Sequence, residues 1–167
     1  MKIKHTNSHS KAWACLRIVL DCALLAIVLL TPASAQTESV IYSFAGQPAD
    51  GGQPSADLIK DSHGNFYSTT YAGGSSNAGT LFKLSPSGGS WTESMLVSLG
   101  GPLGPANPVA PVVISSTGNL YTTASSGGAA NVGEVFEVSK IGGLWEVTGS
   151  LSFGASGTSL RRVAHGS

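Results

Sequence analysis

Apolar and polar side chains alternate in short runs along this chain, and stretches rich in Gly, Ser, Asn and Asp separate the runs. In residues 65–70, Phe66 and Ser68 fall on one side of an extended backbone and Tyr67 and Thr69 on the other, because strand side chains alternate. After residue 35 no segment sustains the 3.6-residue period of a helix. The pattern therefore predicts short β-strands joined by tight turns.

The predicted strands form two sets of four. They span residues 56–60, 65–70, 80–84 and 91–99 in the first set, and 112–115, 119–124, 134–138 and 144–153 in the second. Each set contains a Gly-rich loop between its second and third strands. Asn77 and Asn131 lie in these loops and are expected to take a left-handed conformation or to cap the turn.

The two sets are copies of one unit. Residues 64–67 (Gly-Asn-Phe-Tyr) recur as residues 118–121 (Gly-Asn-Leu-Tyr), an offset of 54 residues. The same offset relates Trp91 to Trp145, and the register needs no gap from Leu58 to Leu99. A period near 50 residues is typical of propeller and solenoid arrays.

A further strand is predicted before the first set, because residues 38–44 resemble residues 93–99. The predicted fold class is all-β: two four-stranded antiparallel propeller-like blades plus this N-terminal strand, a partial β-propeller that follows an N-terminal signal helix. Propellers typically have about 4–8 blades, so two blades cannot close a ring. The chain is therefore expected to be a fragment or partial array, or to self-associate to complete a propeller.

The expected organisation has five parts. They are a signal peptide (1–35), an unpaired strand with its loop (36–55), a first blade (56–107), a second blade (108–153) and a disordered or truncated tail (154–167). The tail departs from the repeat, because the spacing places a Pro at position 162 and Arg162 stands there.

The first 35 residues have the pattern of a secretory signal. A basic start with four Lys or Arg residues precedes an apolar run over residues 22–30, and Ala33-Ser34-Ala35 fits a cleavage site. The alternative is a retained membrane anchor, but Asp21 and Pro32 bound the apolar run below the roughly 20 residues that a span needs. We expect cleavage after Ala35 and a periplasmic or extracellular location, with no membrane attachment afterwards.

Charge and cysteine content exclude several classes of function. The mature chain would keep five basic and eight acidic residues, a net charge of −3 with neutral His, which is not the basic footprint of a nucleic-acid binder. Cys15 and Cys22 both lie in the signal segment, which excludes a disulfide or a Cys-ligated zinc site from the rest of the chain.

No catalytic, cofactor or metal site is predicted. The Gly-rich loops contain no Asp or Glu for calcium, and they precede strands rather than the helix of a phosphate-binding loop. Asp57 and Asp61 could form an acid–base pair, but neither recurs in the second unit. Glu134 and Glu137 are expected on a solvent-facing edge of their strand.

The aromatic residues allow two interpretations. Trp91 and Trp145 begin the fourth strand of each set, where they either stack against a sugar or pack beside the Gly-Gly turn. The packing interpretation is favoured, and ligand stacking is kept as the alternative. Tyr67 and Tyr121 are interpreted as packing residues whose hydroxyls reach water or a neighbouring strand.

Residues 64–84 and 118–138 share the pattern Gly-Asn-[Leu/Phe]-Tyr-x-Thr, then Gly-Gly-x-x-Asn-x-Gly, then [Leu/Val]-Phe-x-[Leu/Val]. This unit resembles the GloVer repeat (Gloeobacter/Verrucomicrobia type) of bacterial secreted choice-of-anchor proteins. Ser68 and Thr122 depart from it, since the family usually has Gly there. The resemblance implies a secreted, β-propeller-like repeat protein and implies no catalytic residue.

The expected function is a binding or surface-interaction role, with glycans or cell-envelope components as partners. The alternative is an extracellular carbohydrate-active enzyme, a hydrolase or lyase, on a propeller scaffold. That alternative rests on analogy at the level of the fold alone.

Overall fold

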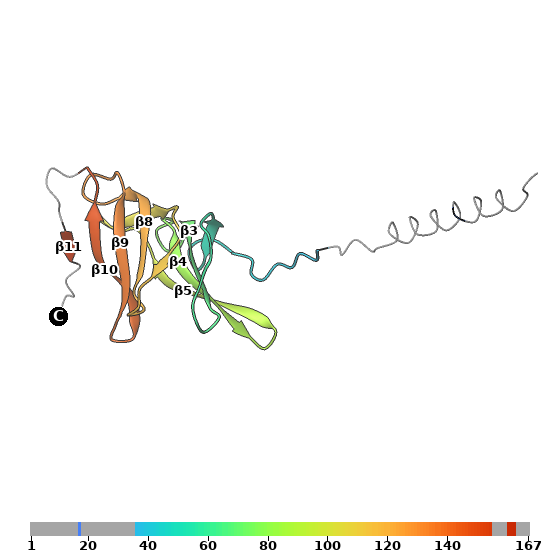
Figure 1. The fold of residues 1–167 in the computed structure, drawn as a ribbon. Helices are drawn as coiled ribbons and strands as arrows, with labels where there is room; N and C mark the ends of the chain where they lie inside the picture. Colours follow the sequence, from blue (N-terminus) through green and yellow to red (C-terminus); the bar gives the residue numbers. More distant parts are fainter. Residues whose placement is uncertain (1–16, 18–35, 155–159, 163–167) are drawn as a thin grey trace, which may run out of the picture. The chain divides into compact units, whose positions relative to one another are not determined.

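The computed structural model describes residue 17, residues 36–154 and residues 160–162. Regular structure in the two longer ranges consists of strands in two antiparallel sheets (Figure 1). Both sheets belong to one compact unit that begins at Val40. The expected signal helix, Arg17 apart, lies outside the described residues.

The first sheet contains five strands in the order β1-β3-β4-β5, with β2 also paired to β3. They are β1 (Gly51–Pro54), β2 (Ile59–Lys60), β3 (Phe66–Gly73), β4 (Thr80–Ser87) and β5 (Ser90–Ser98). Strand β2 pairs with the beginning of β3 and β1 with its end. Strands β1 and β2 therefore act as one interrupted strand, and the sheet has the four-strand plan that the sequence predicts.

The second sheet repeats this plan in the order β11-β10-β9-β8-β6, with β7 paired to β8. Its strands are β6 (Pro105–Pro108), β7 (Val113–Ile114), β8 (Leu120–Gly127), β9 (Glu134–Ile141), β10 (Leu144–Ser152) and β11 (Leu160–Arg162). Strand β11 adds an edge beyond β10. These three residues lie in the tail, where the sequence predicts coil.

The prediction of an N-terminal strand is wrong for the described residues 36–46, which form no strand. Side chains hold this segment instead. The ring of Phe44 lies edge-on to Phe82 of β4, with centroids 4.9 Å apart. Both the Tyr42 hydroxyl and the Ala45 amide donate to one carboxylate oxygen of Asp50, at 2.9 and 2.8 Å.

Strands β1 and β6 lie outside the predicted strands, and their sequences, Gly-Gly-Gln-Pro and Pro-Ala-Asn-Pro, are typical of turns. Each contains one residue with positive φ, Gln53 at 55° and Asn107 at 54°. The end of β3 or β8 offers a partner edge to each segment. Tertiary pairing therefore overrides local preference at both places.

The hydrophobic core lies between the two sheets. Tyr67, Leu81 and Leu99 of the first repeat join a cluster with the second repeat. The second repeat contributes Val112, Leu120, Ala124, Phe136 and Val138. Alternation on β8 and β9 directs these side chains to one face, so the back of the first sheet packs on the front of the second.

Asn107 fixes the second sheet to the first. Its backbone N–H donates to the carbonyl of Ala78 at 2.7 Å, and its side-chain amide donates to the carbonyl of Tyr71 at 3.0 Å. Pro108 then lies against Gly79, where a Cβ would meet the Pro108 Cδ at 2.7 Å. The absence of a side chain at Gly79 thus allows the two repeats to approach closely.

Candidate binding groove

A groove of about 850 Å³ lies where the first hairpin turns of the two repeats meet. Residues 59–63 with Tyr67 line it from the first repeat, and residues 112–120 line it from the second. Lys140 and Trp145, at the facing ends of β9 and β10, complete the lining. The two turns occupy equivalent places in the repeat, so the groove is a product of repeat packing.

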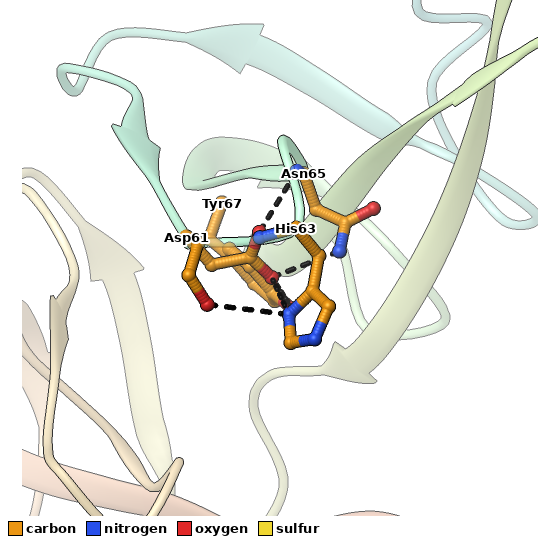
Figure 2. A network of polar contacts seen from close by, with 5 residues as sticks. Asp61, His63, Asn65 and Tyr67 are labelled. Atoms are coloured by element: carbon orange, nitrogen blue, oxygen red, sulfur yellow. Dashed lines mark hydrogen bonds and ion pairs between the residues drawn. The ribbon is translucent and has the colours of Figure 1, made fainter.

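Asp61 organises the turn of the first repeat (Figure 2). One carboxylate oxygen accepts the backbone N–H of His63 at 2.8 Å and of Asn65 at 2.9 Å. The other accepts the side-chain amide of Asn65 at 2.8 Å and the hydroxyl of Tyr67 at 3.1 Å. Gly64 closes the turn with a φ of 87°, a conformation that favours glycine.

These contacts shift two pKa values. Partial burial acts to raise the pKa of Asp61, but the hydrogen bonds from Asn65, His63 and Tyr67 outweigh it and the pKa is lowered. Burial and the adjacent Asp61 carboxylate raise the pKa of Tyr67 to about 12. At neutral pH the turn therefore holds an ionised carboxylate and a neutral phenol. The imidazole of His63 is exposed beside them, with its Nδ1 at 4.0 Å from Asp61.

The second repeat builds the same turn with a different acceptor. Ser115, at the position of Asp61, accepts the backbone N–H of Asn119 at 3.0 Å. A Glu137 carboxylate oxygen on β9 accepts the side chains of Asn119 at 2.6 Å and Tyr121 at 2.9 Å. Both repeats therefore give the Gly-Asn-x-Tyr segment a carboxylate, one from the turn and the other from a strand.

The two tryptophans lie in different surroundings. Trp145 is half-buried in the groove lining, and the ammonium nitrogen of Lys140 lies 5.1 Å from its ring centroid. Trp91 does not line this groove, and its ring lies 5.1 Å from the ring of Phe66. The structure therefore brings Trp145, but not Trp91, to the polar turns. Stacking against a ligand stays a prediction for both.

The prediction that Glu134 faces solvent is wrong, because its side chain is fully buried. Residues three apart on a strand point to opposite faces, so Glu134 and Glu137 could not share one edge. Glu134 lies on the side of Phe136 and Val138. One of its oxygens is 3.4 Å from the Ser152 hydroxyl, and the other has no partner among the described residues.

The prediction for the Gly-rich loops is confirmed. Asn77 and Asn131 have φ values of 52° and 54°, and their side-chain oxygens accept the amides of Gly73 at 3.0 Å and Gly127 at 2.9 Å. Among the described residues there is no group of three or more His, Cys, Asp or Glu side chains that could hold a metal ion. No helix in the same part of the chain is long and apolar enough to cross a membrane.

Asp57 is exposed, whereas Asp61 accepts the four hydrogen bonds of its turn. Asp61 therefore has a structural use that explains its presence in the turn. The groove also contains Lys140 and His63, which belong to no recurring motif of the sequence. Neither recurs in the other repeat, where Pro86 and Thr117 stand, so only the packing of the repeats reveals them.

A family model for the Gloeobacter/Verrucomicrobia repeat matches residues 26–163. The chain belongs to this repeat family. Both described sheets lie within the match, which confirms the resemblance noted at residues 64–84 and 118–138. The Gloeobacter/Verrucomicrobia repeat is thus seen here as one antiparallel sheet per unit. No curated protein and no solved structure matches the chain.

Proposed function

We propose that this chain is a secreted, propeller-type repeat protein that binds a glycan or another sugar-bearing component of the cell envelope. The single observation that carries the proposal is the groove between the repeats, where Trp145 lies beside two polar turns. The choice-of-anchor class, a periplasmic or extracellular location and self-association into a propeller belong to the same proposal.

The chemistry of the groove suits a neutral sugar. The half-buried indole of Trp145 can offer a flat apolar surface to one face of a pyranose ring once the Lys140 side chain, whose ammonium nitrogen lies 5.1 Å from the ring centroid, moves aside. Ser116 and Thr117 in one turn and Ser62 in the other are exposed hydroxyl groups that can pair with sugar hydroxyls. A few polar groups around an aromatic surface are typical of small-ligand sites.

The propeller geometry is supported by the strand plan. Each repeat forms an antiparallel sheet in which consecutive strands are neighbours, and the two sheets pack face against face. Secretion is supported by the basic start, the apolar run and the Ala-Ser-Ala site of the first 35 residues.

A pair of tryptophan variants tests the binding role. Glycan-array screening first selects a saccharide, and calorimetry then compares the wild type with Trp145→Ala and Trp91→Ala. We expect Trp145→Ala to weaken binding at least about tenfold, the equivalent of ~1.4 kcal/mol, because it removes the stacking surface. Trp91→Ala is the matched control, since Trp91 occupies the same repeat position outside this groove.

Absence of binding across the array, or an equal loss in the two variants, would contradict the proposal. Turnover of a bound saccharide would instead favour the carbohydrate-active enzyme. Product analysis by chromatography on the same saccharides separates these outcomes.

A further inference from the structure

The interface inside the chain has two chemically distinct sides. Tyr67 and Leu81 present the back of the first sheet, and Leu120, Phe136 and Val138 present the front of the second. Their burial is nearly complete: Tyr67 is 9% exposed, and each of the other four is at most 1% exposed. One repeat therefore recognises the next through its back face.

The second sheet carries the same back face without a cover in the described structure. Tyr121 and Val135 stand at the positions of Tyr67 and Leu81. Tyr121 is 36% exposed, four times the exposed fraction of Tyr67, and Val135 is only half-buried. We define Val113, Tyr121, Thr123 and Val135 as the terminal back face. Val113, directly across from Tyr121 on β7, is 62% exposed and also borders the groove.

The first sheet has the complementary front face. Phe66, Phe82 and Leu84 stand where Leu120, Phe136 and Val138 stand in the second sheet, and Phe82 and Leu84 are already buried within the chain, at 2% and 3% exposed. The contacts that Asn107 and Pro108 make with the first sheet, here called the polar lock, also have a counterpart. Gln53 and Pro54 are equivalent to Asn107 and Pro108. Gln53 shares the unusual positive φ of Asn107, at 55° and 54°, yet Gln53 and Pro54 are exposed.

We propose that the terminal back face binds the first repeat of a second copy of this chain, head to tail. Gln53 of that copy would approach the carbonyls of Ser125 and Val132, which are equivalent to those of Tyr71 and Ala78. Pro54 would lie on Gly133, the equivalent of Gly79. This inference deepens the self-association included in the proposed function and rests on its propeller geometry. Such a contact is heterologous, so it forms a ring if the rotation closes.

The N-terminal segment regulates this contact by covering the same place. Phe44 lies on Phe82 and is equivalent to Leu99, which packs into the core at the internal interface. Phe153 is the equivalent of Leu99 and is 46% exposed. In a head-to-tail contact, Phe153 of the first copy would occupy the position that Phe44 of the second copy holds on its own first sheet. The segment that Asp50 holds through Tyr42 and Ala45 must therefore leave before copies join.

Disulfide trapping tests the geometry on the full chain. Position 132 corresponds to Ala78 and position 53 to Asn107, two residues joined by a 2.7 Å backbone hydrogen bond. Cysteines at equivalent places in two copies would be close enough to cross-link. In a Cys15→Ser, Cys22→Ser background, Gln53→Cys protein is mixed with Val132→Cys protein under mild oxidation. The control mixture uses Leu144→Cys, an exposed site at the start of β10, where it pairs with the last residue of β9.

We expect several-fold more cross-linked dimer from the 53–132 mixture than from the 53–144 mixture, measured on non-reducing gels. Val113→Asp should lower that yield several-fold, and Phe44→Ser should raise it because it weakens the covering segment.

Equal yields in the two mixtures, or faster dimerisation of Val132→Cys alone, would overturn the head-to-tail contact. An unchanged or lower yield with Phe44→Ser would overturn regulation by the segment. Saccharide binding without cross-linking would overturn this inference and leave the groove proposal standing.

Discussion

At the scale of single residues, the two repeats satisfy the same hydrogen-bond requirement with carboxylates from different places. Asn65 and Tyr67 donate to Asp61 in their own turn, whereas Asn119 and Tyr121 donate to Glu137 on the neighbouring strand. Ser115 stands in the second repeat at the position of Asp61, and Lys83 stands in the first repeat at the position of Glu137. The requirement therefore belongs to the Asn-x-Tyr segment, and either position can meet it.

Replacing Asp61 by Asn should destabilise the fold by about 1 kcal/mol at pH 7, because a charged acceptor of four hydrogen bonds is lost. The pKa of Asp61 is lowered on folding, so its contribution is present above its unfolded pKa and disappears as the pH falls through the lower folded value. The difference between wild type and variant should therefore shrink below about pH 4. Urea unfolding at pH 7 and pH 2.5 measures it.

Asp57→Asn is the matched control, because Asp57 is an exposed carboxylate of the same repeat. It should leave the unfolding free energy unchanged at both pH values. In the second repeat, Glu137→Gln should likewise destabilise the protein, and adding Ser115→Asp should recover part of the loss. A difference between wild type and Asp61→Asn that persists at pH 2.5 would argue against an ionised acceptor.

At the scale of strands, one packing site differs between the sheets in three coupled residues. The hydroxyls of Thr70 and Thr80 bond at 2.8 Å in the first sheet and fill the space beside Gly51. In the second sheet the same positions hold Ala124, Glu134 and Pro105. Pro105 has a Cβ where Gly51 has none. The neighbouring positions 70 and 80 in the first sheet, and 124 and 134 in the second, must therefore hold side chains that leave different amounts of space.

Gly51→Ala should cost about 1–3 kcal/mol of stability, the usual effect of overpacking. The new Cβ would lie 2.6 Å from the Thr70 Cγ2 and 2.9 Å from the Thr80 Oγ1. Adding Thr70→Ala should recover much of the loss, because the second sheet already combines a Cβ with Ala124. Thermal unfolding of the single and double variants gives the coupling energy. Strict additivity would show that positions 51 and 70 are independent.

At the scale of the whole molecule, the two sheets are joined by the apolar interface and by the lock at Asn107. The Asn107 side chain links β6 to the Tyr71 carbonyl and also accepts the hydroxyl of Ser126 at 2.7 Å. Asn107 makes these contacts with a positive φ of 54°. Besides the apolar interface, the contact between the repeats therefore uses one residue in a conformation that Asn tolerates better than most.

Asn107→Gly should lower the unfolding free energy by about 1 kcal/mol more than Gln53→Gly does, measured by urea titration at low protein concentration. Both changes place Gly at a positive φ and add similar backbone entropy to the unfolded chain, so their difference isolates the side-chain contacts between the sheets. Equal losses in the two variants would show that the apolar interface alone sets the arrangement.

The sequence by itself determined the repeat, the strand-rich fold and the family. Alternation and the 54-residue offset specify β3, β4, β5 and their counterparts, because a strand's faces and its turns are written in neighbouring residues. The left-handed Asn77 and Asn131 were predictable for the same reason. Alternation applied strictly would also have placed Glu134 inside.

Only the tertiary structure decided which additional strands form and how the two repeats contact each other. Strands β1 and β6 form although their sequences are typical of loops, because the ends of β3 and β8 offer each a partner edge. Residues 38–44 stay irregular although they resemble β5, which forms by pairing with β4 of its own repeat. The groove and its Lys140 and Trp145 likewise exist through packing between units 54 residues apart. The alternation of neighbouring residues encodes each sheet. Contacts between the two repeats join residues far apart in the sequence, and the pattern within one repeat does not specify them.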